Sequence, residues 1–204
     1  MKKLALLILP LALTGCATTA VNSGATFSEN GNSLGTHYLA RPARQAQLSA
    51  IRQWSARGNI AIHTEQKGWN ASFNWQQQGE NYNLVLFGPL GTNRVQLIGS
   101  PQQVTLQSAT RTVTSTSAET LLQQQLGWSV PVSNLYYWLR GMPAPGSRAR
   151  QSYDLNNHIV QLTQDGWHII YLRYISVNGV DVPNRLLLSN PRLQVRVLIT
   201  QWDF

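Results

Sequence analysis

Hydrophobic residues alternate with polar ones through most of the chain. From position 69 to 76, large or small apolar residues take every second place, with Asn, Ser and Gln between them. A period of two is typical of a strand with one buried and one exposed face. The same criterion, with Gly, Asn, Asp and Pro as separators, predicts strands at 58–63, 69–76, 82–87, 94–98, 103–107, 110–114, 152–155, 159–164, 167–175, 185–189 and 194–202.

The helical period replaces this alternation in three short segments, at 47–56, 121–126 and 134–139. Ser117 has the character of an N-cap before the second helix, and Gly127 ends it. Many short strands joined by turns, with one helical insertion, predict a mainly β protein with a small helical part. We expect its antiparallel sheet to curl into a barrel or half-barrel. Periodicity does not distinguish a filled interior from a cavity.

The first residues have the composition of an export signal. Lys2 and Lys3 precede an apolar run at 4–13, and small residues lead to Cys16, the only cysteine. A charged start, a short apolar stretch and a small-residue cleavage site define a signal peptide, here predicted over 1–15. The run of about ten residues is too short to span a membrane, which needs about twenty. Leu13-Thr14-Gly15-Cys16 resembles the bacterial lipobox, which predicts that Cys16 carries lipid. The alternative is a plain secretory signal.

Two further regions follow the signal. Residues 16–46 are rich in Ala, Thr, Ser, Asn and Gly without a sustained apolar period, which predicts a lipidated N-terminus and a flexible tether. Residues 47–204 are expected to form one folded domain. Asp after the lipidated cysteine tends to retain such lipoproteins in the inner membrane. Ala17 occupies that position, so we expect an outer-membrane lipoprotein that faces the periplasm.

Charge and reactive side chains narrow the possible functions. The formal net charge of +8 falls to +6 when Lys2 and Lys3 leave with the signal. The expected location excludes nucleic acid as a partner, and the dispersed arginines favour a solvated basic face over a dedicated site. The four histidines form no metal-binding pair, and neither a Gly-x-Ser-x-Gly elbow nor a phosphate loop occurs. We therefore predict no enzyme, no metal site and no cofactor.

One turn has an unusual composition. Leu90 lies between Pro89 and Gly91, where a turn would normally carry polar residues. Glycine has no side chain that could shield Leu90 from solvent, so Leu90 is expected to be exposed at a loop tip. Packing of Leu90 back onto the core is the alternative. An exposed apolar side chain on a membrane-tethered domain indicates contact with lipid or a lipidated partner.

Several motifs in this order and spacing resemble the LolB family of outer-membrane lipoprotein receptors, from about Trp54 to Trp202. They are Trp54-x-x-Arg57-Gly58, Trp69-x-Ala71-x-Phe73-x-Trp75, Gly88-Pro89-Leu90-Gly91, Ser117-Ala118-Glu119, Gly127-x-x-x-Pro131-Val132-x-x-Leu135-x-x-Trp138-Leu139 and Trp167-x-x-x-Tyr171. The resemblance implies an incomplete antiparallel barrel whose helices cover an apolar cavity for acyl chains. It further implies a monomer that accepts client lipoproteins from the periplasmic carrier LolA. The receptor then inserts them into outer-membrane lipid, with Leu90 in the membrane-insertion loop.

Alternation and helix faces predict the residues that line such a cavity. They are Phe73, Trp75, Leu84, Leu86, Leu106, Leu135, Trp138, Ile170, Leu172, Leu187 and Val197. A register error of one residue would move a whole strand's contribution to the opposite face. Two other functions fit the same sequence features, namely a structural or assembly lipoprotein with a solid core and a lipocalin-like binder of small lipids.

Overall fold

Eleven strands and three helices make up the part of the chain that the computed structural model describes, residues 38–89 and 93–204. The helices are α1 (Arg41–Ala50), α2 (Ala118–Leu126) and α3 (Val132–Trp138). The strands are β1 (Gln53–Thr64), β2 (Gly68–Gln78), β3 (Asn81–Phe87), β4 (Val95–Gly99), β5 (Val104–Gln107), β6 (Thr112–Ser115), β7 (Ala149–Tyr153), β8 (Ile159–Gln164), β9 (Trp167–Val177), β10 (Val180–Asn190) and β11 (Leu193–Asp203). The predicted mainly β composition is confirmed.

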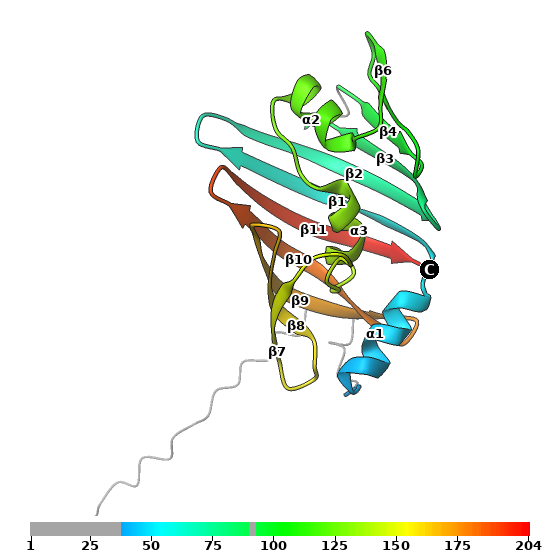
Figure 1. Cartoon of the computed structure of the whole chain (residues 1–204), viewed down its shortest axis with the longest axis vertical. Coiled ribbons are helices and arrows are strands. Elements are labelled where there is room, and N and C mark those ends of the chain that lie inside the picture. Colours follow the sequence, from blue (N-terminus) through cyan, green and yellow to red (C-terminus); the bar gives the residue numbers. More distant parts are fainter. Residues whose placement is uncertain (1–37, 90–92) are drawn as a thin grey trace, which may run out of the picture. The chain divides into compact units, whose positions relative to one another are not determined.

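All these strands belong to one antiparallel sheet in the order β6-β5-β4-β3-β2-β1-β11-β10-β9-β8-β7. The pairing of β1 with β11 joins the first six strands to the last five. Strands β6 and β7 lie at the two edges, so the sheet curves without closing (Figure 1). The structure confirms the predicted incomplete barrel.

Register determines which side chains share a face of the sheet. Phe73 pairs with Leu86 and Trp75 pairs with Leu84. Directly opposed residues of antiparallel strands lie on the same face. This row continues through Leu97 of β4 to Leu106 of β5, and all of these side chains are buried. We call the face that carries these residues the inner face, and the opposite one the outer face.

The helical insertion between β6 and β7 lies over the inner face (Figure 1). Helix α2 begins as expected, because the Ser117 hydroxyl accepts a hydrogen bond from the Thr120 amide. It ends at Gly127, which adopts a left-handed conformation with φ of 79°. Leu121 and Leu122 face inward and are buried. None of the helices in the described ranges is long and apolar enough to cross a membrane.

The predicted helix at 47–56 is wrong in position. Helix α1 starts at Arg41 with Pro42 in its first turn, where the missing amide hydrogen costs little. It therefore includes residues assigned to the tether. Trp54 lies on β1, paired with Gln77 of β2. Helical spacing relates Leu48, Ile51 and Trp54, which is why the helix was expected to continue to Trp54. Trp54 also begins an alternating pattern, and its pairing with β2 places it in a strand.

Candidate functional site

An apolar cavity lies between the inner face and the helical insertion. Its floor is formed by strands β1, β2, β3, β10 and β11. Its roof is formed by α2, α3, the loop between them and the residue after α3. All fourteen lining residues are hydrophobic: Ile60, Phe73, Trp75, Leu84, Leu86, Leu122, Trp128, Val130, Val132, Leu135, Leu139, Leu188, Val195 and Val197. Such a site offers dispersion and burial of apolar surface but no specific hydrogen bond.

The cavity is almost filled by the protein's own side chains. Only about 40 Å³ of its space can hold the centre of a water-sized sphere, so little room is left for a ligand. Periodicity could not distinguish a filled interior from a cavity, and in this structure the interior is nearly filled. An acyl chain fits only if the roof moves away from the floor.

Tryptophans beside the cavity present apolar surface because their polar atoms are bonded elsewhere. The Trp75 indole N–H donates to Gln77 Oε1 over 2.8 Å, and the Trp138 N–H donates to Gln164 Oε1 over 2.9 Å. Buried indoles usually find such a partner. Trp128 also packs against Trp69, with 5.4 Å between the ring centroids. The Trp75 ring in the cavity wall can therefore contact an apolar ligand without leaving its N–H unbonded.

The structure brings together six of the residues predicted to line the cavity. Phe73, Trp75, Leu84, Leu86, Leu135 and Val197 all contribute to its wall. Leu106 and Trp138 are buried in the surrounding core but do not line the cavity.

Three of the predicted lining residues are placed wrongly. Ile170, Leu172 and Leu187 lie on the outer face, because Ile170 pairs with Leu187 and Leu187 pairs with Arg196. Leu172 is 52% exposed. Their neighbours Ile169, Tyr171 and Leu186 point inward and are buried. The prediction was one residue out of register on β9 and β10, the error that reverses a strand's faces.

Sequence reasoning also missed part of the wall. Leu188 and Val195 would follow from alternation in the correct register, since they pair with each other across β10 and β11. Leu122 lies on the apolar side of α2 and could have been found from helical periodicity. Trp128 and Val130 come from the loop between α2 and α3, where no period applies.

Glu119 joins the two roof helices. Its carboxylate accepts hydrogen bonds from the Val132 amide at the start of α3, over 2.9 Å, and from the Ser117 hydroxyl, also over 2.9 Å. A carboxylate at a helix N-terminus is favoured by the exposed amides and the helix dipole. Helices α2 and α3 are therefore linked directly as well as through their connecting loop.

Arg140 fixes the end of α3 to α1. Its guanidinium donates to the carbonyl oxygens of Leu48 and Ile51 over 3.1 and 2.7 Å, and lies 4.0 Å from the Tyr136 ring centroid. Burial lowers the pKa of Arg140, and the Tyr136 hydroxyl opposes this shift. Arg140 is almost fully buried, so it does not belong to the solvated basic face expected from the dispersed arginines.

A polar cluster, formed by the buried residues Arg44, His158 and Asp181 and by Asp154 at its exposed rim, holds α1 against the sheet. Asp181 Oδ2 lies 3.3 Å from Arg44 Nη1 and 3.0 Å from His158 Nε2, while His158 Nδ1 lies 2.9 Å from Asp154 Oδ2. Burial alone would raise the pKa of the Asp154 carboxyl, but hydrogen bonds from His158 outweigh this and lower it. Within the described ranges no group of residues is suited to bind a metal ion.

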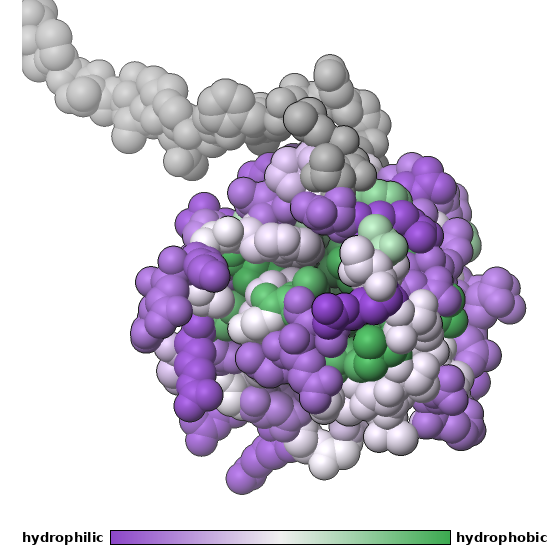
Figure 2. All heavy atoms as spheres, turned by 90° about the horizontal axis from the view of Figure 1, so that it is seen from above, coloured by the Kyte–Doolittle hydropathy of each residue, from purple (hydrophilic) through white to green (hydrophobic). Residues whose placement is uncertain are grey.

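Apolar surface is also visible from outside the molecule. Figure 2 shows hydrophobic patches that lie recessed among hydrophilic side chains at the end seen from above. Cys16 and Leu90, the predicted lipidation and membrane-insertion residues, lie outside the described residues, as do the predicted signal peptide and most of the tether.

Fold and site together define an open half-barrel protein with a helix-covered apolar cavity. A LolA superfamily protein from Nitrosomonas europaea shares the architecture with a TM-score of 0.56 and 9% identity, covering 81% of this chain and 94% of that one. A DUF1329 family protein from Desulfovibrio piger has a TM-score of 0.57 and 8% identity, covering 79% and 89%. At such identities the likeness concerns the fold alone.

The chain belongs to the LolB family. The model of this family, described as outer membrane lipoprotein LolB, matches residues 52–202. An outer-membrane lipoprotein LolB from Coxiella burnetii is 36% identical, covering 98% of this chain and 92% of the relative. Relatives with the same description from Nitrosococcus oceani and Pseudomonas fluorescens are 38% and 39% identical, covering 78% and 76% of this chain and 81% and 77% of the relatives. Membership of this family supports a lipid-anchored outer-membrane protein with a lipoprotein receptor and insertion function.

Proposed function

We propose that the apolar cavity takes the acyl chains of client lipoproteins and that the protein then passes them to the outer membrane. The observation that carries this proposal is the wall of fourteen hydrophobic residues between the sheet and the helices. The periplasmic carrier LolA is the proposed donor, and the receptor acts as a monomer. Transfer requires no covalent step, no metal and no cofactor, so the protein acts as a receptor and not as an enzyme.

Opening of the roof is the proposed first step of uptake. Each methylene buried contributes about 0.8 kcal/mol, so an acyl chain can offset the apolar contacts that the roof loses. Leu122, Leu135 and Leu139 contact the floor only through apolar surface. Their replacement by acyl methylenes leaves no polar group unsatisfied. Because α2 and α3 are linked through Glu119, they would move together.

Release into the membrane is the second step. Leu90 is proposed to enter the lipid as a single apolar contact at the tip of the loop that follows Phe87, Gly88 and Pro89. Cys16, with its attached lipid, serves as the anchor that keeps the protein at the outer membrane. Acyl chains then leave a small cavity for the larger apolar volume of the bilayer.

Occupancy of the cavity can be tested by fluorescence quenching. A client lipoprotein with brominated acyl chains, presented on its carrier, should quench tryptophans that line the cavity. Trp128→Phe should remove part of this quenching because Trp128 is in the wall. Trp202→Phe is the matched control, since Trp202 is buried but does not line the cavity. Equal quenching in all three proteins would refute uptake at this site, and preference for free fatty acid over client would favour a small-lipid binder.

Substitution of the loop leucine separates uptake from delivery. Leu90→Glu should leave quenching by the brominated client unchanged, because the cavity is intact. Delivery of the client to liposomes should fall strongly, because a carboxylate is costly to place in an apolar phase. Leu90→Ile is the conservative control. Full delivery by Leu90→Glu would contradict the proposed role of Leu90.

A further inference from the structure

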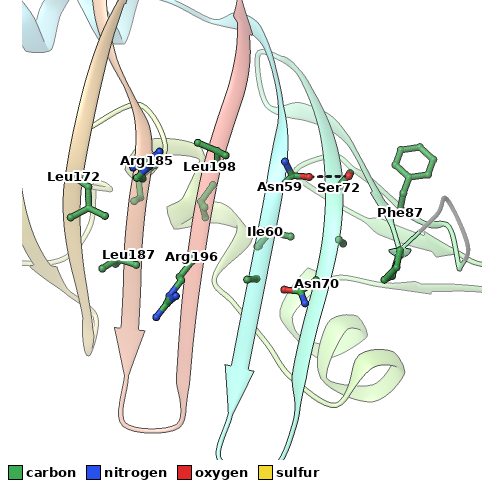
Figure 3. Close-up of a pocket in the computed structure, with 16 residues that line it drawn as sticks. Asn59, Ile60, Asn70, Ser72, Phe87, Leu172, Arg185, Leu187, Arg196 and Leu198 are labelled. Carbon is green, nitrogen blue, oxygen red and sulfur yellow. Dashed lines mark hydrogen bonds between the residues drawn. The ribbon is translucent and has the colours of Figure 1, made fainter. Parts of the chain in front are cut away.

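A second hollow lies on the outer face of the sheet, away from the cavity. Its volume is about 960 Å³. Residues of β1, β2, β9, β10 and β11 line it, together with Phe87 at the end of β3 and the two residues that follow. The side chains that face it include Asn59, Ser72, Leu172, Arg185, Leu187, Arg196 and Leu198 (Figure 3). No described helix covers this face, since the helical insertion lies on the other side of the sheet (Figure 1).

Leucine and arginine alternate across this outer groove. Arg185 pairs with Leu198, and Leu187 pairs with Arg196, so each arginine stands beside a leucine on the neighbouring strand (Figure 3). Leu172 on β9 extends the apolar part and is 52% exposed. The surface thus combines accessible methyl groups with two exposed guanidinium groups.

Among the residues that the structure describes, no acidic side chain pairs with the positive charge of the outer groove. None of its lining residues is Asp or Glu. Within the described part of the chain, no carboxylate lies within salt-bridge distance of Arg185 or Arg196. Structural ion pairing therefore does not account for these arginines. Charge complementarity favours an anionic surface as the occupant.

We propose that the outer groove docks on anionic phospholipid of the membrane that holds the lipid anchor. Guanidinium groups bind phosphate oxygens in a bidentate manner, and leucines between them can contact the glycerol and upper acyl region. Phe87, Gly88 and Pro89 line the groove and lead into the loop proposed to insert Leu90, so both contacts would lie on the same side. Docking in this way leaves α2 and α3 facing the periplasm. The inference rests on the proposed function for its membrane partner, but its residues are distinct from Cys16 and Leu90.

The test uses the full lipidated protein in vesicles. A fluorophore is attached to Leu172→Cys, with Leu155→Cys as control, because Leu155 is 95% exposed in the β7–β8 turn and outside the groove. Vesicles contain phosphatidylcholine alone or with phosphatidylglycerol, plus a lipid that carries a quencher near its headgroup. The label at 172 should be quenched in the anionic vesicles only, and the label at 155 in neither. An unquenched label at 172 would refute docking by this face.

Removal of charge tests the role of the arginines. Arg185→Gln and Arg196→Gln should each lower the docking equilibrium about fivefold, the usual effect of one basic residue near an anionic surface. Arg185→Lys and Arg196→Lys should retain most of the docking, and added salt should weaken it. Unchanged quenching in the Gln variants, or quenching that appears only when a carrier protein is added, would overturn the proposal. Quenching of cavity tryptophans by a brominated client should not change, so failure of this inference is distinguishable from failure of the receptor function.

Discussion

The apolar cavity and the polar cluster are both buried, but different forces hold them. Hydrophobic side chains alone line the cavity, so the contacts across it have no preferred direction. Hydrogen bonds from α3 to β8 and the turn after it lie beside the cavity, from Trp138 to Gln164 and from Asn134 to Asp165. In the polar cluster, Asp181 lies within 3.3 Å of Arg44 and 3.0 Å of His158. Each of those distances is set by hydrogen-bond geometry.

This difference indicates which part of the molecule can move apart to admit a ligand. Acyl methylenes can take the place of aliphatic side chains, since apolar groups of similar volume exchange at modest cost. A buried charge cannot lose its counter-charge so cheaply. The polar cluster therefore fixes α1, and Arg140 ties α1 to the end of α3. Movement is expected at α2 and at the start of α3, where it would break the exposed hydrogen bond from Asn134 to Asp165.

The largest predicted effect comes from the polar cluster. Asp181→Asn keeps the shape of the side chain but leaves Arg44 and His158 buried without this carboxylate. The free energy of unfolding should fall by about 3–5 kcal/mol, as measured by urea denaturation. Asp203→Asn is the control, because Asp203 is exposed and such surface changes stay within about 0.5 kcal/mol. A loss below about 1 kcal/mol for Asp181→Asn would show that the cluster does not hold α1 as argued.

An added methyl group distinguishes the cavity from filled core. Val197→Ile should place its extra carbon in the cavity and stabilise the protein by about 0.5–1 kcal/mol. Val182→Ile makes the same change in fully buried core away from the cavity, where overpacking costs about 1–3 kcal/mol. Urea denaturation measures both values. Val197→Ile should also weaken quenching by a brominated client, because it competes for the same space.

Destabilisation of equal size in the two valine variants would mean that the cavity behaves as packed core. Stabilisation of Val197→Ile without weaker client quenching would separate the cavity from the path of the acyl chains. Either result would remove the link between the apolar region and ligand uptake.

Much of the fold could be predicted because local pattern and tertiary structure agree. On β2, Phe73 and Trp75 alternate with polar residues, so only one register buries the apolar set. The αL residue Gly127 ends α2 where a glycine was expected to end it. Phe73 and Trp75 are two of the six wall residues that were predicted correctly.

Where both faces of a strand are apolar, the sequence does not show which face points inward. Residues 169–172 read Ile-Ile-Tyr-Leu and 186–188 are three leucines, so either register satisfies the pattern. The sheet places Ile169 and Leu186 inward and leaves Leu172 and Leu187 outside. Register shifts beside Arg185 add a further irregularity that sequence spacing does not reveal.

The polar cluster was beyond sequence reasoning for a different reason. Arg44 and Asp181 are 137 positions apart and come together only in the folded sheet. Charged residues are mostly exposed, so a pattern-based reading leaves them on the surface. Arg44 also lies in a segment whose composition, up to residue 46, is that of a tether. Its burial follows from long-range pairing and not from any local period.

The smallest predicted effect concerns Asp154, which forms the exposed rim of the polar cluster. Its lowered pKa means that the carboxylate contributes stability above the unfolded value of about 3.9, and that this contribution is lost as pH falls through the folded pKa. Asp154→Asn should therefore lower the free energy of unfolding near neutral pH, with a difference from wild type that shrinks in acid. The side chain is 37% exposed, so solvent screening keeps the effect below about 1 kcal/mol. Urea denaturation from about pH 6 to about pH 3 measures this difference. A difference that stays constant or grows in acid would show that His158 owes its position to Asp181 alone.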